Sequence, residues 1–168
     1  MVQASRRTMR AVLALLKVLI VLNLVAIIPL LLVLGGTFTE LVAQQLREDY
    51  PASALDTLLP GVRAVLLIAL LMVPLAHVLL TRLRAIVATV EAGDPFVAAN
   101  AGRLKTIAWS LLGIQLLDLA FGAVTLALEP SFGWSFALTG WLAVVLLFVL
   151  ARVFDDGTQM REELAGTV

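Results

Sequence analysis

The chain lacks cysteine altogether and contains a single histidine and a single tyrosine. Without cysteine it can form neither a disulfide nor a thiolate metal site, and it has no thiol nucleophile. His77 alone cannot build a histidine-rich metal site, and with Tyr50 it leaves few groups for acid–base catalysis. No Walker loop, Rossmann glycine pattern, zinc-protease helix or nucleophile elbow occurs. We therefore predict no enzymatic activity, no cofactor, and no catalytic or metal-binding residues.

Charge is also scarce. Charged residues make up 14% of the 168 residues and apolar residues 61%, whereas soluble proteins average about 25% and roughly 45–50%. A soluble fold of this size cannot bury so much apolar surface, but a lipid bilayer can solvate it. The net charge is zero, so no basic surface for nucleic acid is indicated. The composition indicates a membrane protein that does not bind nucleic acid directly.

Four long apolar segments lie between more polar stretches, at residues 11–34, 62–80, 104–128 and 136–153. Each has the length, about 17–25 residues, that a helix needs to cross the hydrocarbon core. We predict an all-α fold, an integral membrane bundle of four transmembrane helices that forms one domain over residues 1–168. The first segment is too long for a signal-peptide core, so we expect it to be retained. Pro74 should kink the second helix near Leu70, and this helix should continue past the lipid to Glu91.

The basic residues indicate how the bundle is oriented. Ten of the twelve lie toward the end that carries both termini and the joint between the second and third segments: Arg6, Arg7, Arg10, Lys17, Arg82, Arg84, Arg103, Lys105, Arg152 and Arg161. The positive-inside rule places this end in the cytoplasm, so both termini are predicted to be cytoplasmic. The outer stretch, residues 35–61, has apolar residues at helical spacing (Phe38, Leu41, Val42 and Leu46). A short amphipathic helix is one interpretation and a solvated loop is the other.

The joint between the second and third segments contains the densest cluster of distinctive residues. Gly93 suits the left-handed residue that closes a helix. Asp94 suits the N-cap of the next helix, with Pro95 at its first position, and Asn100 offers an alternative cap. Phe96 could fold back against the bundle. The candidate cytoplasmic motif is Gly93, Asp94, Pro95, Phe96, Asn100 and Arg103. It is either a plain helix–turn–helix joint or a surface that binds a partner.

A second candidate site lies inside the membrane. Asp118 shares one helical face, at about 100° per residue, with four other residues: Gln115, Gly122, Thr125 and Glu129. A carboxylate at mid-membrane costs about 2.5–3.5 kcal/mol, so it should face protein or water. Asn23 lies at a similar depth and is expected to be its neutral partner. The candidate intramembrane site is Asn23, Gln115 and Asp118. It is either a hydrated crevice that binds a cation, a proton or a basic group, or a buried network that sets the helix register.

Two cytoplasmic stretches carry a family resemblance. They are Val90–Val97 with Asn100, Arg103 and Leu104, and Val153–Gly157 with Arg161–Leu164 and Thr167-Val168. Both resemble the YoaS-like family of bacterial four-span membrane proteins of unknown function. Members of that family are often encoded beside a small Cro-like helix-turn-helix regulator. The resemblance therefore implies a bacterial cytoplasmic membrane and a regulator as partner, while Asp118 and His77 lie outside these motifs.

We thus expect a multi-pass protein that signals to, or sequesters, a small helix-turn-helix transcriptional regulator. Its inner face would consist of the joint and of residues 154–168. One alternative is a small transporter, or an ion- or proton-binding membrane subunit, that uses Asp118. Another is a structural subunit of a larger membrane complex. The expected partners are the lipid bilayer, the regulator and, as a further alternative, a second copy of the chain.

Overall fold

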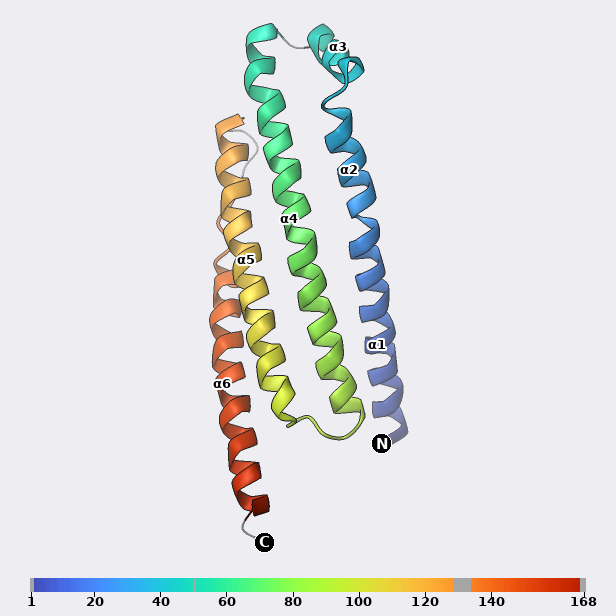
Figure 1. The fold of residues 1–168 in the computed structure, drawn as a ribbon, viewed down its shortest axis with the longest axis vertical. Helices are drawn as coiled ribbons and strands as arrows, with labels where there is room; N and C mark the ends of the chain where they lie inside the picture. Colours follow the sequence, from blue (N-terminus) through green and yellow to red (C-terminus); the bar gives the residue numbers. More distant parts are fainter. Residues whose placement is uncertain (1, 50, 129–133, 167–168) are drawn as a thin grey trace.

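The computed structural model describes residues 2–49, 51–128 and 134–166, and this part of the chain is helical, without strands. Its helices are α1 (Val2–Val25), α2 (Ile27–Gly36), α3 (Glu40–Asp49), α4 (Ala52–Glu91), α5 (Ala98–Leu128) and α6 (Leu138–Gly166) (Figure 1). Four stretches are long and apolar enough to cross a membrane: Thr8–Gly36, Ala54–Glu91, Ala98–Leu128 and Leu138–Met160. The prediction of an all-α chain with four such stretches is confirmed.

The first of these stretches consists of two helices, α1 and α2, which meet at Ala26. Pro29 accounts for the break, because it has no N–H to bond to the carbonyl of Val25 and its ring crowds that carbonyl. The N–H of Ala26 still bonds to the carbonyl of Leu22 at 2.9 Å. The chain therefore continues in nearly the same direction after the break (Figure 1).

Helix α4 is the longest element, with 40 residues that include Pro60 and Pro74. At about 1.5 Å per residue it is about 60 Å long, twice the thickness of the hydrocarbon core, so it extends beyond the lipid. The prediction that this helix reaches Glu91 is confirmed. Pro74 removes one backbone hydrogen bond but does not end the helix. The kink near Leu70 stays a prediction.

The long helices pack in a row, α1 and α2 against α4, α4 against α5, and α5 against α6 (Figure 1). Glycines bring these helices close together, because large side chains occupy the space that a Cβ would take. Leu75 of α4 lies 2.9 Å from the Cβ position of Gly113 in α5, and Leu128 of α5 lies over Gly61 of α4. This pairing of a small residue with a large one is typical of helix contacts within membranes.

Both termini and the α4–α5 joint lie at one end of the bundle, which we call the joint end (Figure 1). Helix α6 begins part-way along α5, and its C-terminal part passes beyond the joint (Figure 1). At the opposite end, α3 is the short helix that was one interpretation of residues 35–61. Its Leu41 is 68% exposed, and the side chain of Leu46 lies outside the described residues.

Arg63 of α4 holds the opposite end together. Its guanidinium donates hydrogen bonds to the carbonyl of Thr37 at 2.6 Å and to the Thr37 Oγ1 at 3.2 Å. The same guanidinium lies 4.0 Å from the ring centroid of Phe38, which adds a cation–π contact. Arg63 therefore satisfies the C-terminal end of α2.

The turn after α4 is closed by two backbone hydrogen bonds. The N–H of Gly93 bonds to the Val90 carbonyl and the N–H of Asp94 to the Thr89 carbonyl, both at 3.1 Å. Together they form a Schellman motif, which places its left-handed residue at Gly93, where φ is +90°. The predicted role of Gly93 is confirmed.

The predicted start of the next helix is wrong. Helix α5 begins at Ala98, so neither Asp94 nor Pro95 takes the N-cap or first-turn position expected of it. Asn100 lies inside the helix and is not a cap either. The physical reason is that the carbonyl of Pro95 accepts a hydrogen bond from the Asn100 side chain at 2.8 Å, which holds residues 95–96 in a turn.

We expect Gly93→Ala to lower the free energy of unfolding by about 1–2 kcal/mol, because an added Cβ disfavours the left-handed backbone. Thermal unfolding in detergent, followed by circular dichroism, measures the effect. The matched control is Gly157→Ala in α6, where nothing lies within 4 Å of the added Cβ, and where alanine should gain about 0.5–1 kcal/mol. A Gly93→Ala variant as stable as the control would contradict this account.

Candidate functional site

Asn100 is the centre of the joint, and its side chain is completely buried. Its amide Nδ2 donates to Thr89 Oγ1 of α4 at 2.7 Å and to the Pro95 carbonyl at 2.8 Å. Its Oδ1 accepts a hydrogen bond from Arg103 at 2.8 Å. One side chain therefore connects the end of α4, the turn and the first turns of α5.

The partners of Asn100 are themselves bonded to the backbone. Arg103 reaches across to the Ala85 carbonyl of α4 at 3.5 Å, and Thr89 Oγ1 donates to the Ile86 carbonyl at 2.7 Å. A buried network in which each member is satisfied is rigid and specifies one arrangement. Gly93, Asn100 and Arg103 therefore have the structural role of a helix–turn–helix joint. They hold α4, the turn and α5 in one fixed arrangement.

Phe96 connects the joint to α6. Its ring stacks on that of Phe154, with 5.4 Å between the centroids and 28° between the ring planes. Phe96 thus folds back against the bundle, as the sequence suggested. Its side chain is still 50% exposed. The contact also joins the two stretches that carry the family resemblance, which lie about 60 residues apart in the chain.

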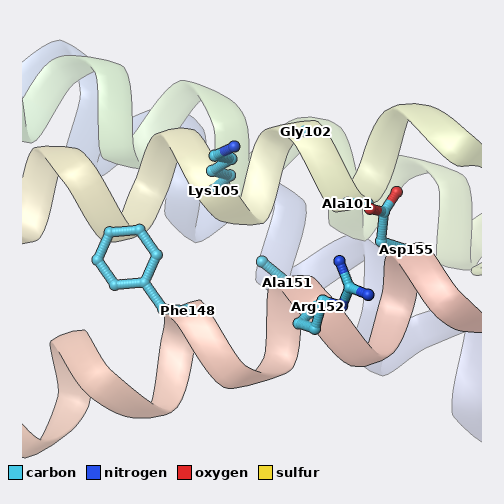
Figure 2. A pocket seen from close by; sticks show the side chains of 7 residues that line it. All are labelled: Ala101, Gly102, Lys105, Phe148, Ala151, Arg152 and Asp155. Atoms are coloured by element: carbon cyan, nitrogen blue, oxygen red, sulfur yellow. The ribbon is translucent and has the colours of Figure 1, made fainter.

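A cavity of about 350 Å³ opens between α5 and α6 at the joint end (Figure 2). It is lined by Ala101, Gly102, Lys105, Phe148, Ala151, Arg152 and Asp155. Ala101 and Ala151 are buried at its base, whereas the charged side chains are exposed. Trp109, one turn along α5 from Lys105, makes an edge-to-face contact with Phe148 at 5.3 Å between centroids. The cavity therefore combines two cations and one carboxylate with an apolar base.

Sequence reasoning did not identify this cavity. Lys105 and Arg152 were recognised only as basic residues at the ends of apolar segments. Their meeting depends on the register of two antiparallel helices, which is set by contacts such as that of Gln115 with Gly140. The small residues Ala101, Gly102 and Ala151 near those cations were the signal that could have suggested a gap between the helices.

The structure does not bring Asn23 and Asp118 together. The Asn23 amide donates to the Val73 carbonyl of α4 at 3.1 Å, and α4 lies between α1 and α5 (Figure 1). The predicted pairing is therefore not found, because Asn23 instead satisfies a backbone carbonyl beside Pro74.

Gln115 and Asp118 both lie on α5, and Gln115 lies at the contact of α5 with α6. The Gln115 side chain fills the space over Gly140 of α6. Asp118 is half-buried, and no hydrogen bond or ion pair connects it to the part of the chain that the structure describes. Among the described residues, therefore, no group forms the buried hydrogen-bond network that was one interpretation of Asp118. Glu129 lies outside the described residues.

His77 is the one histidine of the chain and lies in α4. The Nδ1 of His77 is buried without a hydrogen-bond partner. No group of three or more His, Cys, Asp or Glu residues in the described ranges could hold a metal ion.

Residues 41–168 match the model of a family described as protein of unknown function (DUF2975). The matched region includes the joint, the cavity and Asp118, whereas α1 and α2 precede it. No curated protein and no solved structure matches the chain.

Replacing Asn100 with alanine is expected to lower the free energy of unfolding by about 2–3 kcal/mol, because Arg103, Thr89 and the Pro95 carbonyl lose a buried partner. Thermal unfolding in detergent gives the comparison. Asn23→Ala is the matched control, since it removes a single half-buried hydrogen bond, worth about 1 kcal/mol. Equal losses in the two variants would show that Asn100 has no special role in the joint.

Proposed function

This chain belongs to the DUF2975 family of proteins of unknown function, and we propose that it holds a small helix-turn-helix regulator at the inner surface of a bacterial cytoplasmic membrane. In this proposal the joint end faces the cytoplasm, because most basic residues of the chain lie toward it. The resemblance of two sequence stretches to the YoaS-like family suggests the regulator as the partner.

The proposal rests most on α6. Its C-terminal part continues as a helix to Gly166, beyond the joint (Figure 1). The Phe96–Phe154 stack attaches the base of this protruding part to the joint, which the Asn100 network makes rigid. A partner therefore meets a preformed surface, and little conformational entropy is lost when it binds.

Charge supports the same partner. Residues 154–168 contain four carboxylates (Asp155, Asp156, Glu162 and Glu163) and one cation, Arg161, for a net charge of −3. A helix-turn-helix regulator presents basic residues where it contacts DNA phosphates. An acidic helix that protrudes from the membrane can occupy that basic surface and so compete with DNA. Regulator bound to the membrane would then be kept from its operator.

We expect wild-type protein in mild detergent to retain a small helix-turn-helix regulator from the same genome. The double variant Glu162→Lys, Glu163→Lys should retain at least about tenfold less, which corresponds to about 1.4 kcal/mol of binding free energy. Quantitative co-purification measures the difference.

The matched control for the tail variant is Glu40→Lys, Glu48→Lys, which reverses two exposed charges on α3 at the opposite end. It should retain the regulator at the wild-type level, since this end would face away from the cytoplasm. The proposal would be overturned if wild-type protein retained no regulator, or if both double variants lost it equally.

Asp118 supports a second candidate function, the binding of a cation or a proton within the membrane. A half-buried carboxylate within a membrane-spanning stretch, with no partner in the described chain, is the type of group that ion pathways use. This function does not require the joint end.

For this candidate we expect purified protein in liposomes to carry a cation or proton flux that falls at least tenfold in Asp118→Asn. Its unfolding temperature should stay unchanged, because no described hydrogen bond is lost. Asp156→Asn, in the C-terminal part of α6, is the control and should keep the flux. Absence of flux in the wild-type protein would remove this candidate and leave the regulator proposal unaffected.

A further inference from the structure

We propose that the cavity between α5 and α6 binds the headgroup of a phosphatidylethanolamine from the leaflet at the joint end. The lipid phosphate lies against Lys105 and Arg152, and the ammonium group lies against Asp155. This inference concerns the lipid and is independent of the regulator.

The depth of the cavity fits a headgroup. Lys105 and Arg152 stand where the apolar runs of α5 and α6 end, so the cavity straddles the boundary between hydrocarbon and water. Trp109, which is 58% exposed and packs on Phe148, lies one turn toward the hydrocarbon. Tryptophan favours this interfacial depth. Basic pockets between membrane helices at the cytoplasmic side are known sites for lipid headgroups.

The size and shape of the cavity also fit. Its volume of about 350 Å³ equals that of about a dozen water molecules at about 30 Å³ each, which is ample for a phosphoethanolamine group. The helices approach closely at the buried Ala101 and Ala151, whereas nothing lies within 4 Å of the Cβ position of Gly102. The acyl chains can leave along the lipid-facing side, past Phe148.

Lys105 and Arg152 can both bind the lipid phosphate. Ammonium and guanidinium groups both donate strong hydrogen bonds to phosphate oxygens. Arg152 also pairs with Asp156 at 3.2 Å, but its side chain is 75% exposed. An exposed pair of this kind holds its partners weakly, so Arg152 can turn toward a phosphate.

Asp155 distinguishes phosphatidylethanolamine from phospholipids with other headgroups. It accepts hydrogen bonds from a primary ammonium, whereas a choline headgroup has no N–H to donate. A phosphatidylglycerol headgroup carries no ammonium group, so it would offer Asp155 no charged hydrogen-bond donor and would place a phosphate near that carboxylate without one. Lys105 and Arg152, together with Asp155 and with the Asp156 that pairs with Arg152, carry no net charge, so the surroundings of the cavity match a zwitterion that has a primary amine.

The experiment titrates purified full-length protein in detergent with phosphatidylethanolamine, phosphatidylglycerol or phosphatidylcholine, and counts bound lipid by native mass spectrometry. We expect one phosphatidylethanolamine per chain, bound at least fivefold more tightly than either other lipid. Lys105→Gln should weaken phosphatidylethanolamine binding about tenfold. Asp155→Asn should remove the preference over phosphatidylglycerol, because it removes the ammonium partner and the repulsion together.

Matched variants separate the cavity from general effects. Arg84→Gln removes an exposed cation at the same end, outside the cavity lining, and should leave binding unchanged. Gly102→Leu should fill the cavity and abolish binding with all charges intact. Gly157→Leu, at a position of α6 outside the cavity lining where an added Cβ also meets nothing within 4 Å, should bind normally.

Several outcomes would overturn the inference. They are no lipid bound above background, phosphatidylcholine binding as tightly as phosphatidylethanolamine, or equal losses in Lys105→Gln and Arg84→Gln. Soluble glycerophosphoethanolamine that binds as tightly as the lipid would also overturn it, since the ligand would then be a free phosphate compound. The regulator is absent from these titrations, so failure of the regulator proposal leaves their result unchanged.

Discussion

The joint end of this protein depends on one buried amide. Asn100 has no access to solvent, and its nitrogen and oxygen bond to α4, to the turn and to α5. A buried polar group is tolerated only when its hydrogen bonds are satisfied, and each bond to Asn100 requires one arrangement of the two helices. Because Arg103 extends the network to the Ala85 carbonyl, the constraint spans more than a turn of α4.

This constraint positions the surfaces that we consider functional. Helix α5 is held by the joint, and α6 packs against α5 through Gln115 at Gly140 and through Trp109 at Phe148. The Phe96–Phe154 stack then attaches the joint directly to the C-terminal part of α6. The cavity and the acidic end of α6 are thus parts of one surface, so a lipid in the cavity and a protein on the tail would be neighbours.

Much of the fold could be predicted because the relevant signals are local. Apolar length predicts the four spanning stretches, and Gly93 predicts a left-handed turn because other residues resist that conformation. The start of α5 could not be predicted in this way. Asp94 and Pro95 have the local pattern of a helix start, but the tertiary bond from Asn100 to the Pro95 carbonyl overrides it.

The candidate sites show the same difference between local signals and tertiary contacts. By itself the sequence determined that four stretches are long and apolar enough to cross a membrane. It also determined where the polar residues lie along each helix. Only the tertiary structure decided which of them meet. Asn23 bonds to α4 and not to Asp118, and Lys105 shares a cavity with Arg152. The physical reason is that a helical pattern specifies the face and the depth at which a residue lies. The neighbour across that face depends on the order and the register of the helices. Close packing at a few glycines sets this register.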